Sequence, residues 1–345
     1  MMKFLITGAS GFLGSHIVER LFCMGERKII CLDVLQPGMK LPGIHYIVQD
    51  ILNLEQLLEV TKDVDIIFHT AALVPLTKAG DRFYEVNVRG TQNVVHCCRR
   101  YSVRKLVHLS SSAIYGIPKD TPITEATEYF PVEIYGRSKL EAEYIVWKYM
   151  EEGGGGAACI RPRTIVGGKS RLGIFQILFE WISENCNIYV IGDGTNPFQF
   201  VHIADLLDAI IQSAFSNTSG LYNIGSKNFG TLHDTLQALI VSAGSASKIK
   251  KLPVFLARTA LGIADLLHLS PLAPWHYLTY HKPFVFDISG AVRALSWQPR
   301  FSDVEALKES YTWYMSHKDG LKRIEGSAHK KPLCFICCLH YQRSL

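Results

Sequence analysis

The chain has 345 residues, of which 48% are hydrophobic and 19% charged, a composition that supports a large buried core and excludes global disorder. The formal net charge of +5 is small for this length, and part of it lies in one stretch near the C-terminus, so the sequence lacks the dense basic stripe of a nucleic-acid-binding protein. No basic region or cleavage site precedes the first apolar run, and no uncharged apolar run approaches the roughly 18 residues that cross a bilayer. We therefore expect a cytoplasmic protein.

The first half of the sequence alternates short apolar runs with helical patterns. A helix is expected over 11–22, closed by Gly25, and helical patterns separate most of the later runs. This alternation is typical of βαβ units and of a parallel sheet buried on both faces. Right-handed crossovers then predict an α/β fold with a doubly wound, Rossmann-type sheet, whose ligand crevice lies at the carboxyl ends of the strands. The predicted strands are 3–7, 28–33, 45–48, 64–69, 105–110 and 157–161.

After Arg161 glycine and proline interrupt this regularity. We interpret 1–162 as the nucleotide-binding Rossmann domain and 163–319 as a smaller C-terminal substrate lobe interleaved with the sheet. The glycine run at 153–156 is interpreted as a loose turn before the sixth strand. Residues 320–345 are basic and cysteine-bearing without a period, which predicts a poorly packed tail. The helices expected in this half are 203–215, 230–243, 253–268 and 303–316.

The cysteines fall into two groups. Six lie singly, mostly in apolar runs, and are interpreted as small core residues of a reducing compartment: Cys23, Cys31, Cys97, Cys98, Cys159 and Cys186. The other three lie in the tail without a second matched cluster, so no metal site is predicted there: Cys334, Cys337 and Cys338.

Three glycines, Gly8, Gly11 and Gly14, follow the first strand and open the first helix. Without side chains the first two let the backbone turn sharply and approach a pyrophosphate, and the third lets the helix pack close to the sheet. The helix N-terminus adds free N–H groups and a positive dipole end. The strand before and the helix after this motif predict a dinucleotide site.

An acidic residue, Asp33, ends the second predicted strand, 19 positions after Gly14. A carboxylate there accepts both hydroxyls of an adenosine ribose and repels the extra phosphate of NADP, so the pattern predicts NAD. Asp50 and Ile51 close the third strand, where they can contact the adenine.

Tyr135 and Lys139 lie four residues apart at the start of a helical pattern and therefore share one helix face. A phenol with a pKa of about 10 is a poor base at neutral pH, but a neighbouring ammonium and a nicotinamide ring stabilise the phenolate. The pair predicts a proton acceptor for an alcohol that gives up hydride. Ser110, Ser111 and Ser112 end the fifth strand, where a hydroxyl would meet the substrate oxygen.

Together these motifs resemble the extended short-chain dehydrogenase/reductase superfamily, also called the NAD-dependent epimerase/dehydratase family, over about residues 2–316. The motifs that carry the resemblance are Gly8-x-x-Gly11-x-x-Gly14, His69-Thr70-Ala71-Ala72, Asn87-Val88-x-Gly90-Thr91, Ser110-Ser111 with Tyr115-Gly116, Tyr135-x-x-x-Lys139, Arg161-Pro162, Gly192-Asp193-Gly194 and Trp297-x-Pro299.

The resemblance implies a role for each site residue. Tyr135 would be the catalytic acid/base, Lys139 would hold the nicotinamide ribose and lower the Tyr135 pKa, and Ser111 would orient the substrate hydroxyl or carbonyl. It implies a homodimer formed through helices at about 81–98 and 136–150. The further cofactor-binding residues that it implies are Ser10, Phe12, Leu13, Ala71, Ala72, Asn87 and Pro162.

The sequence narrows the branch of the family. Dehydratases carry an Asp-Glu pair where this chain has Ser112-Ala113, which argues against water elimination. Sugar-nucleotide epimerases place an Arg-Asp pair, whose Arg contacts the substrate diphosphate, where this chain has Phe198-Gln199. Arg163 or Arg171 is a possible replacement, because a planar guanidinium suits phosphate.

The second half is also similar to 3β-hydroxysteroid dehydrogenase-like members, which the sequence favours. Its apolar stretch at 252–269 follows three lysines and is interpreted as a lobe helix packed on the core, with an apolar substrate mouth or membrane-surface contact as alternatives. The first hypothesis is hydride transfer between NAD and a secondary alcohol or ketone, such as a hydroxysteroid-like alcohol. The alternatives are a nucleotide-sugar 4-epimerase that retains NAD and a non-catalytic NAD-binding sensor.

Overall fold

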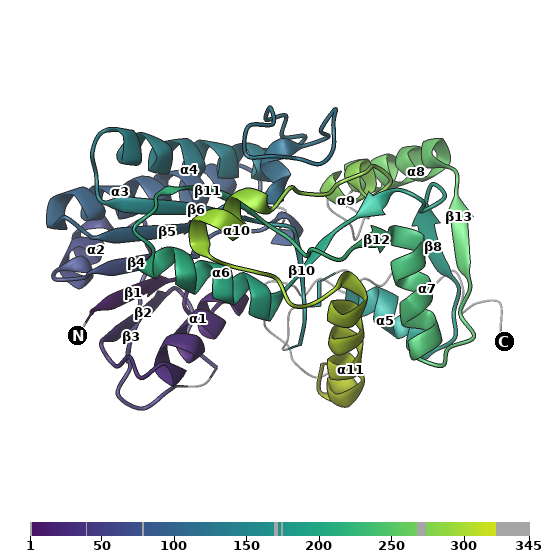
Figure 1. Ribbon diagram of the computed structural model, residues 1–345, viewed down its shortest axis with the longest axis horizontal. Helices are drawn as coiled ribbons and strands as arrows, with labels where there is room; N and C mark the ends of the chain where they lie inside the picture. The colour runs from purple at the N-terminus through teal and green to yellow at the C-terminus, as the bar shows by residue number, and fades with distance from the viewer. Residues whose placement is uncertain are drawn as a thin grey trace.

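The computed structural model describes residues 2–38, 40–77, 79–168, 172–173, 175–267 and 274–321. Within them, seven strands form one parallel sheet in the order β11-β6-β5-β4-β1-β2-β3 (Figure 1). This order confirms the predicted doubly wound, Rossmann-type sheet. The strands are β1 (Phe4–Thr7), β2 (Ile29–Asp33), β3 (His45–Val48), β4 (Ile66–His69), β5 (Lys105–Leu109), β6 (Gly156–Pro162) and β11 (Gly220–Ile224).

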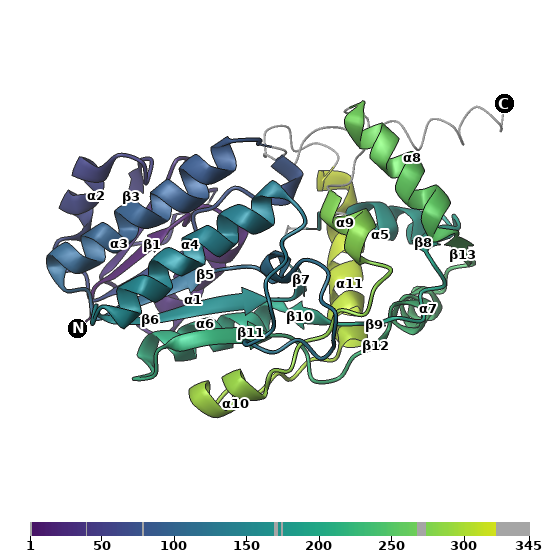
Figure 2. The ribbon, with the colours of Figure 1, turned by 90° about the horizontal axis from the view of Figure 1, so that it is seen from above.

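Helices cover both faces of the sheet because alternate residues of each strand point to opposite sides. In β1, Phe4 and Ile6 pack into one core while Leu5 packs into the other. Figure 2 shows α3 and α4 running together over one face, and α6 and α10 lie together on the other. The first face carries α2 (Leu54–Thr61), α3 (Gly90–Tyr101) and α4 (Ile134–Glu151), and the second carries α1 (Phe12–Cys23), α6 (Ile203–Phe215) and α10 (Ser289–Leu295).

The seventh strand, β11, was not predicted. Its sequence is only five residues long and opens with Gly220, and Asn223 interrupts the apolar run. Asn223 is nevertheless fully buried, because its Oδ1 accepts a hydrogen bond of 2.8 Å from the Tyr115 hydroxyl. The buried polar side chain of this strand therefore has a hydrogen-bond partner in the protein interior, which no local sequence pattern predicts.

Most predicted elements are found with small changes at their ends. The predicted fifth strand ends at Leu109 instead of Ser110, and the fourth begins at Ile66. The helix expected over 303–316 continues to Leu321. Both α6 and β11 follow the predicted domain boundary at residue 162 and pack on the sheet. The division into domains stays a prediction.

The lobe lies at the opposite end of the long axis from the N-terminus (Figure 1). It has its own core, in which Phe179, Leu239 and Leu307 are completely buried. Two-stranded sheets pair β7 with β10, β9 with β12 and β8 with β13. Its elements are β7 (Thr164–Val166), α5 (Phe175–Ser183), β8 (Ile188–Ile191), β9 (Pro197–Phe198), β10 (Phe200–His202), β12 (Gly230–Thr231), α7 (Leu232–Ser242), β13 (Ile249–Leu252), α8 (Val254–Leu266), α9 (Pro274–Thr279) and α11 (Asp303–Leu321).

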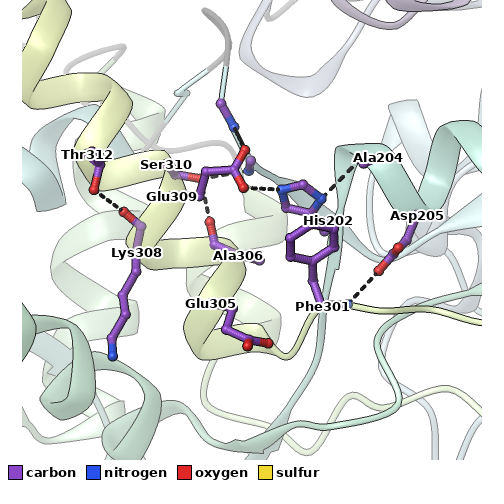
Figure 3. A network of polar contacts seen from close by, with 12 residues as sticks. His202, Ala204, Asp205, Phe301, Glu305, Ala306, Lys308, Glu309, Ser310 and Thr312 are labelled. Atoms are coloured by element: carbon purple, nitrogen blue, oxygen red, sulfur yellow. Dashed lines mark hydrogen bonds and ion pairs between the residues drawn. The ribbon is translucent and has the colours of Figure 1, made fainter. Parts of the chain in front are cut away.

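A polar network joins the lobe helix α11 to α6 on the sheet (Figure 3). His202 precedes α6 and accepts a hydrogen bond from the Ala204 N–H at 3.2 Å. Its ring stacks on Phe301 with centroids 3.8 Å apart, and its Nε2 lies 3.2 Å from a carboxylate oxygen of Glu309 on α11. The Asp205 carboxylate accepts the Phe301 N–H at 3.0 Å, so the chain entering α11 is held at two points.

The expected packing of the apolar stretch at 252–269 is wrong for much of its surface. The stretch forms α8, which packs against α9 and buries Ala257. However, Phe255 is 76% exposed and Leu266 is 79% exposed. The membrane-surface alternative stays a prediction. In the described part of the chain, no helix combines the length and the hydropathy that a bilayer crossing needs.

The interpretation of the six cysteines as core residues is confirmed in part. Cys31, Cys97, Cys98 and Cys159 are buried, whereas Cys23 is exposed. Cys186 is half-buried. The predicted tail at 320–345, with its three cysteines, lies outside the described residues from 322 onward.

Candidate active site

Two glycines of the turn between β1 and α1 leave space that a side chain would fill. Gly8 has φ +72°, and a Cβ atom there would lie 2.6 Å from the backbone nitrogen of Ala71. A Cβ atom at Gly14 would lie 2.1 Å from the Gly8 carbonyl oxygen. Because α1 begins at Phe12 without a side-chain cap, its first N–H groups face an approaching anion. The turn therefore fits the pyrophosphate of a dinucleotide.

Asp33 lies at the end of β2 beside this turn. Its Oδ2 accepts a hydrogen bond from the Ser10 N–H at 2.9 Å, and its Oδ1 accepts one from the Leu35 N–H at 3.0 Å. These bonds hold the carboxylate at the carboxyl edge of the sheet, where a ribose bound at the turn would lie. The predicted contact of Asp33 with that ribose stays a prediction.

The two residues expected near the adenine lie differently. Asp50 accepts a hydrogen bond from the Leu52 N–H at 2.9 Å and shapes the turn after β3. Ile51 is only 4% exposed, and it packs so closely on α3 that a Cβ atom at Gly90 would lie 2.3 Å from its Cδ1. Ile51 is thus chiefly a core residue, and its contact with adenine stays a prediction.

Asn87 braces the segment that follows β4. Its Oδ1 accepts the Leu73 N–H at 2.8 Å, and its Nδ2 donates to the Leu73 carbonyl at 3.2 Å and to Ser138 Oγ at 3.0 Å. These bonds tie the half-buried Ala71 and Ala72 to the helix that carries Tyr135. The structure therefore gives Asn87 a positioning role, beside the predicted lining role of the two alanines.

The structure brings the three predicted catalytic residues onto touching elements. Tyr135 and Lys139 lie one turn apart on α4, and Ser111 caps the short 3-10 helix η3 (Ser112–Tyr115) that follows β5. α4 packs so closely on η3 that a Cβ atom at Gly136 would lie 2.7 Å from the Ala113 carbonyl oxygen. The packing places the phenol, the ammonium and the serine at the carboxyl ends of β5 and β6.

Lys139 is an ammonium buried in the protein. It is 3% exposed, and its Nζ donates a hydrogen bond to the Leu109 carbonyl. Burial lowers the pKa of Lys139 to about 8. Tyr135 is 8% exposed and meets the Phe83 ring edge-on at 5.8 Å between centroids. Both groups are therefore largely shielded from water.

An acidic residue near this pair was missed in the sequence. Glu133 precedes α4 as its N-cap residue, two positions before Tyr135. Burial raises the pKa of its carboxyl to about 7, and its Oε1 has no hydrogen-bond partner among the described residues. An acidic residue just before a helix was the available signal. Its presence adds a group that titrates near neutral pH at this helix end.

Arg161 is committed to the protein's own framework. It forms a buried ion pair with Glu143 of α4, and its Nη1 and Nη2 donate to the hydroxyls of Tyr115 and Tyr129 at 2.6 and 2.8 Å. Pro162 ends β6 directly after it. Glu143 was also missed, although it lies four residues after Lys139 on the same helix. The network joins α4, β6 and the segment after η3.

The next arginine, Arg163, is equally buried but differently partnered. It is 2% exposed, and its Nη1 donates to Ser112 Oγ at 3.4 Å. Burial lowers its pKa to about 10. Its Nε and Nη2 have no hydrogen-bond partner in the part of the chain that the structure describes. The other predicted candidate, Arg171, lies outside the described residues.

Phe198 and Gln199, which stand where sugar-nucleotide epimerases place an Arg-Asp pair, pack into the protein's own framework. Phe198 stacks its ring near the Arg163 guanidinium, 4.9 Å from the ring centroid to Cζ. Gln199 is fully buried, accepts the Phe286 N–H at 2.9 Å and donates to the Ser226 carbonyl at 2.7 Å. Neither residue is thus available to a phosphate. The described residues contain no cluster of three or more metal-ligating side chains.

These features define a dinucleotide-dependent α/β enzyme with a Tyr-Lys pair. The chain belongs to the NAD dependent epimerase/dehydratase family, whose model matches residues 4–225. This confirms the predicted family and NAD as its cofactor.

Individual relatives span most of the chain. It is 39% identical to the uncharacterized protein y4nG of Sinorhizobium fredii over 95% of this chain and 83% of that protein. It is 27% identical to a UDP-glucose 4-epimerase of Streptococcus mutans over 92% of this chain and 98% of the relative. A solved structure of a UDP-glucose 4-epimerase from Thermotoga maritima superposes with a TM-score of 0.77 at 21% identity, covering 92% of this chain and all of that one.

Proposed function

We propose that this chain is a nucleotide-sugar 4-epimerase that moves hydride between NAD and one carbinol carbon of the sugar. The observation that carries the proposal is the packing of α4 on η3, which collects Tyr135, Lys139 and Ser111 at one edge of the sheet. The match to the Streptococcus mutans UDP-glucose 4-epimerase continues through the lobe and supports the choice of substrate class. This choice revises the order of the hypotheses from the sequence, which placed net dehydrogenation first.

NAD, when bound, supplies the acceptor and then the donor of hydride. Tyr135, as its phenolate, takes the proton of the carbinol hydroxyl as the carbon loses hydride, and the resulting phenol returns the proton when hydride comes back to the opposite face of the ketone. Lys139, one helical turn away, stabilises the phenolate by its positive charge. The Ser111 hydroxyl donates a hydrogen bond to the substrate oxygen and holds it at the phenol.

Net dehydrogenation of an apolar secondary alcohol is the second candidate. Phe198 and Gln199 replace the Arg-Asp pair expected of a sugar-nucleotide enzyme, and phenylalanine rings line this part of the lobe. The two candidates share all their catalytic residues and differ in whether NADH accumulates.

The test incubates the full chain and NAD with UDP-glucose, UDP-glucuronic acid, UDP-N-acetylglucosamine and hydroxysteroids. Interconversion of a sugar at C4 without net NADH is the expected result. NADH formed with an apolar alcohol would replace the epimerase by the dehydrogenase, and tight NAD binding without turnover of any of these would favour a sensor. Tyr135→Phe should abolish turnover and keep NAD affinity; turnover that survives this change would contradict the assigned base.

A further inference from the structure

Arg161 and Arg163 are two residues apart, are both buried, and differ in one respect. Arg161 has a carboxylate partner, Glu143, and two phenol partners. The Arg163 side chain has no ion pair and only one hydrogen bond, to Ser112, within the described ranges. A buried charge without a partner is costly, and folded proteins usually neutralise or pair it. The contrast marks Arg163 as a residue held for something other than the framework.

Three phenylalanine rings lie close to the Arg163 guanidinium. Its Cζ lies 4.2 Å from the ring centroid of Phe284, 4.9 Å from that of Phe198 and 5.7 Å from that of Phe286. Such contacts offset part of the desolvation of the cation. They cannot satisfy its N–H groups, which point outward in the plane of the guanidinium. The rings therefore support the cation without giving its Nε and Nη2 groups a conventional hydrogen-bond acceptor.

The two nitrogens without a partner, Nε and Nη2, are neighbours on the same side of the guanidinium. Their N–H bonds run side by side, which is the geometry that receives two oxygens of a carboxylate or a phosphate. The Tyr280 phenol and the Asp303 carboxylate both act on the charge of Arg163. The carboxylate already accepts hydrogen bonds from the Phe200 N–H at 3.1 Å and from the Ser226 hydroxyl. Arg163 thus presents two parallel N–H donors, and the Asp303 carboxylate is occupied by other hydrogen-bond partners.

Arg163 also lies next to the candidate catalytic residues. It joins β6 to β7, and its Nη1 reaches Ser112, the residue that follows Ser111. We propose that Arg163 binds an oxyanion of the substrate through Nε and Nη2, and so holds the nucleotide sugar beside Ser111 and Tyr135. The inference rests on the proposed function, and it deepens it: the oxyanion is the diphosphate or a carboxylate on the sugar. Both nitrogens are buried, so a neighbouring ring must shift to admit the ligand.

The test measures binding to NAD-loaded protein by calorimetry with uridine, UDP, UDP-glucose and UDP-glucuronic acid. Arg163→Gln should weaken the charged ligands by roughly 10- to 100-fold and leave uridine unchanged, because a charge-assisted hydrogen bond is lost. Equal losses for UDP and both sugars identify the diphosphate as the source. A loss confined to UDP-glucuronic acid identifies the carboxylate. The exposed Arg27→Gln is the matched control and should bind as the wild type does.

Exchanging two touching side chains tests the location of the charge. Arg163→Phe combined with Phe198→Arg keeps one cation and the same number of rings but moves the guanidinium across the contact. The double variant should recover affinity that Arg163→Phe alone loses.

Two results would overturn the proposal, and a third would separate it from the proposed function. Charged ligands that bind Arg163→Gln as tightly as the wild type would overturn it. So would a clear fall in the unfolding midpoint of Arg163→Gln, because removal of an unpaired buried charge should not destabilise the fold. If UDP binding depends on Arg163 but no sugar is turned over, the proposed function fails and the oxyanion site stands.

Discussion

Replacing Lys139 with methionine separates the stability cost of a buried ammonium from its catalytic use. Burial lowers the pKa of this residue from 10.5 to about 8, and the difference corresponds to about 3 kcal/mol of folding free energy. Methionine has a similar length and no charge, so this cost disappears. The lost hydrogen bond to the Leu109 carbonyl offsets about 1 kcal/mol. The variant should therefore be about 2 kcal/mol more stable at pH 7, and inactive.

The stability difference between the wild type and the Lys139→Met variant should depend on pH. The folded chain releases the Lys139 proton at a lower pH than the unfolded chain, so the unfolded chain holds more protons between pH 8 and 10.5. Wild-type stability contributed by this residue therefore rises with pH across that window. The methionine variant lacks this rise. The advantage of the variant should shrink by roughly 2 kcal/mol between pH 7 and pH 9.5.

Urea unfolding of both proteins at the two pH values measures the effect. Lys148→Met is the matched control, because Lys148 lies on the same helix with a 74% exposed side chain. Its stability difference from the wild type should not change with pH. A Lys139→Met protein that is less stable at pH 7, with a difference that stays constant to pH 9.5, would refute the reasoning.

Three other variants test the framework of the site. Gly14→Ala should lower both NAD affinity and stability, the latter by about 1–3 kcal/mol, because its Cβ would meet the Gly8 carbonyl; NAD titration and urea unfolding check this, and normal values for both would contradict the close packing. Glu143→Gln should cost about 3–5 kcal/mol because it leaves Arg161 charged and buried, and a loss below about 1 kcal/mol by chemical denaturation would argue against the pairing. Asp33→Asn should reduce the preference for NAD over NADP by roughly tenfold, measured by fluorescence titration, and an unchanged preference would remove the ribose role.

Much of the framework was readable because its causes are local. The run of strands and the glycine turn depend on residues close in sequence, so the positions of six strands and of α1 along the chain were predicted. The spacing of Tyr135 and Lys139 also has one local meaning on a helix, a shared face. β11 was not predicted because the evidence for it is not local. Asn223 is tolerated in the protein interior because the Tyr115 hydroxyl, more than a hundred residues earlier, donates a hydrogen bond to it.

The fates of the two buried arginines show where the sequence stops being informative. Arg161 and Arg163 stand in one short run, and the run itself does not show which of them has a carboxylate partner. Only the tertiary structure brings Glu143 to the first and three phenylalanine rings to the second. Partnership of a buried charge depends on which distant side chains converge on it, because hydrogen bonds and ion pairs act over a few ångströms.

The sequence by itself determined the class of fold, the family and its NAD cofactor, since these follow from motifs whose physical meaning is local. The tertiary structure decided which polar side chains are paired within the protein. It bound Asn87, Gln199 and Arg161 into the framework and left Nε and Nη2 of Arg163 without a hydrogen-bond partner among the described residues. That difference arises from packing across the junction of sheet and lobe, where residues from both halves of the chain meet.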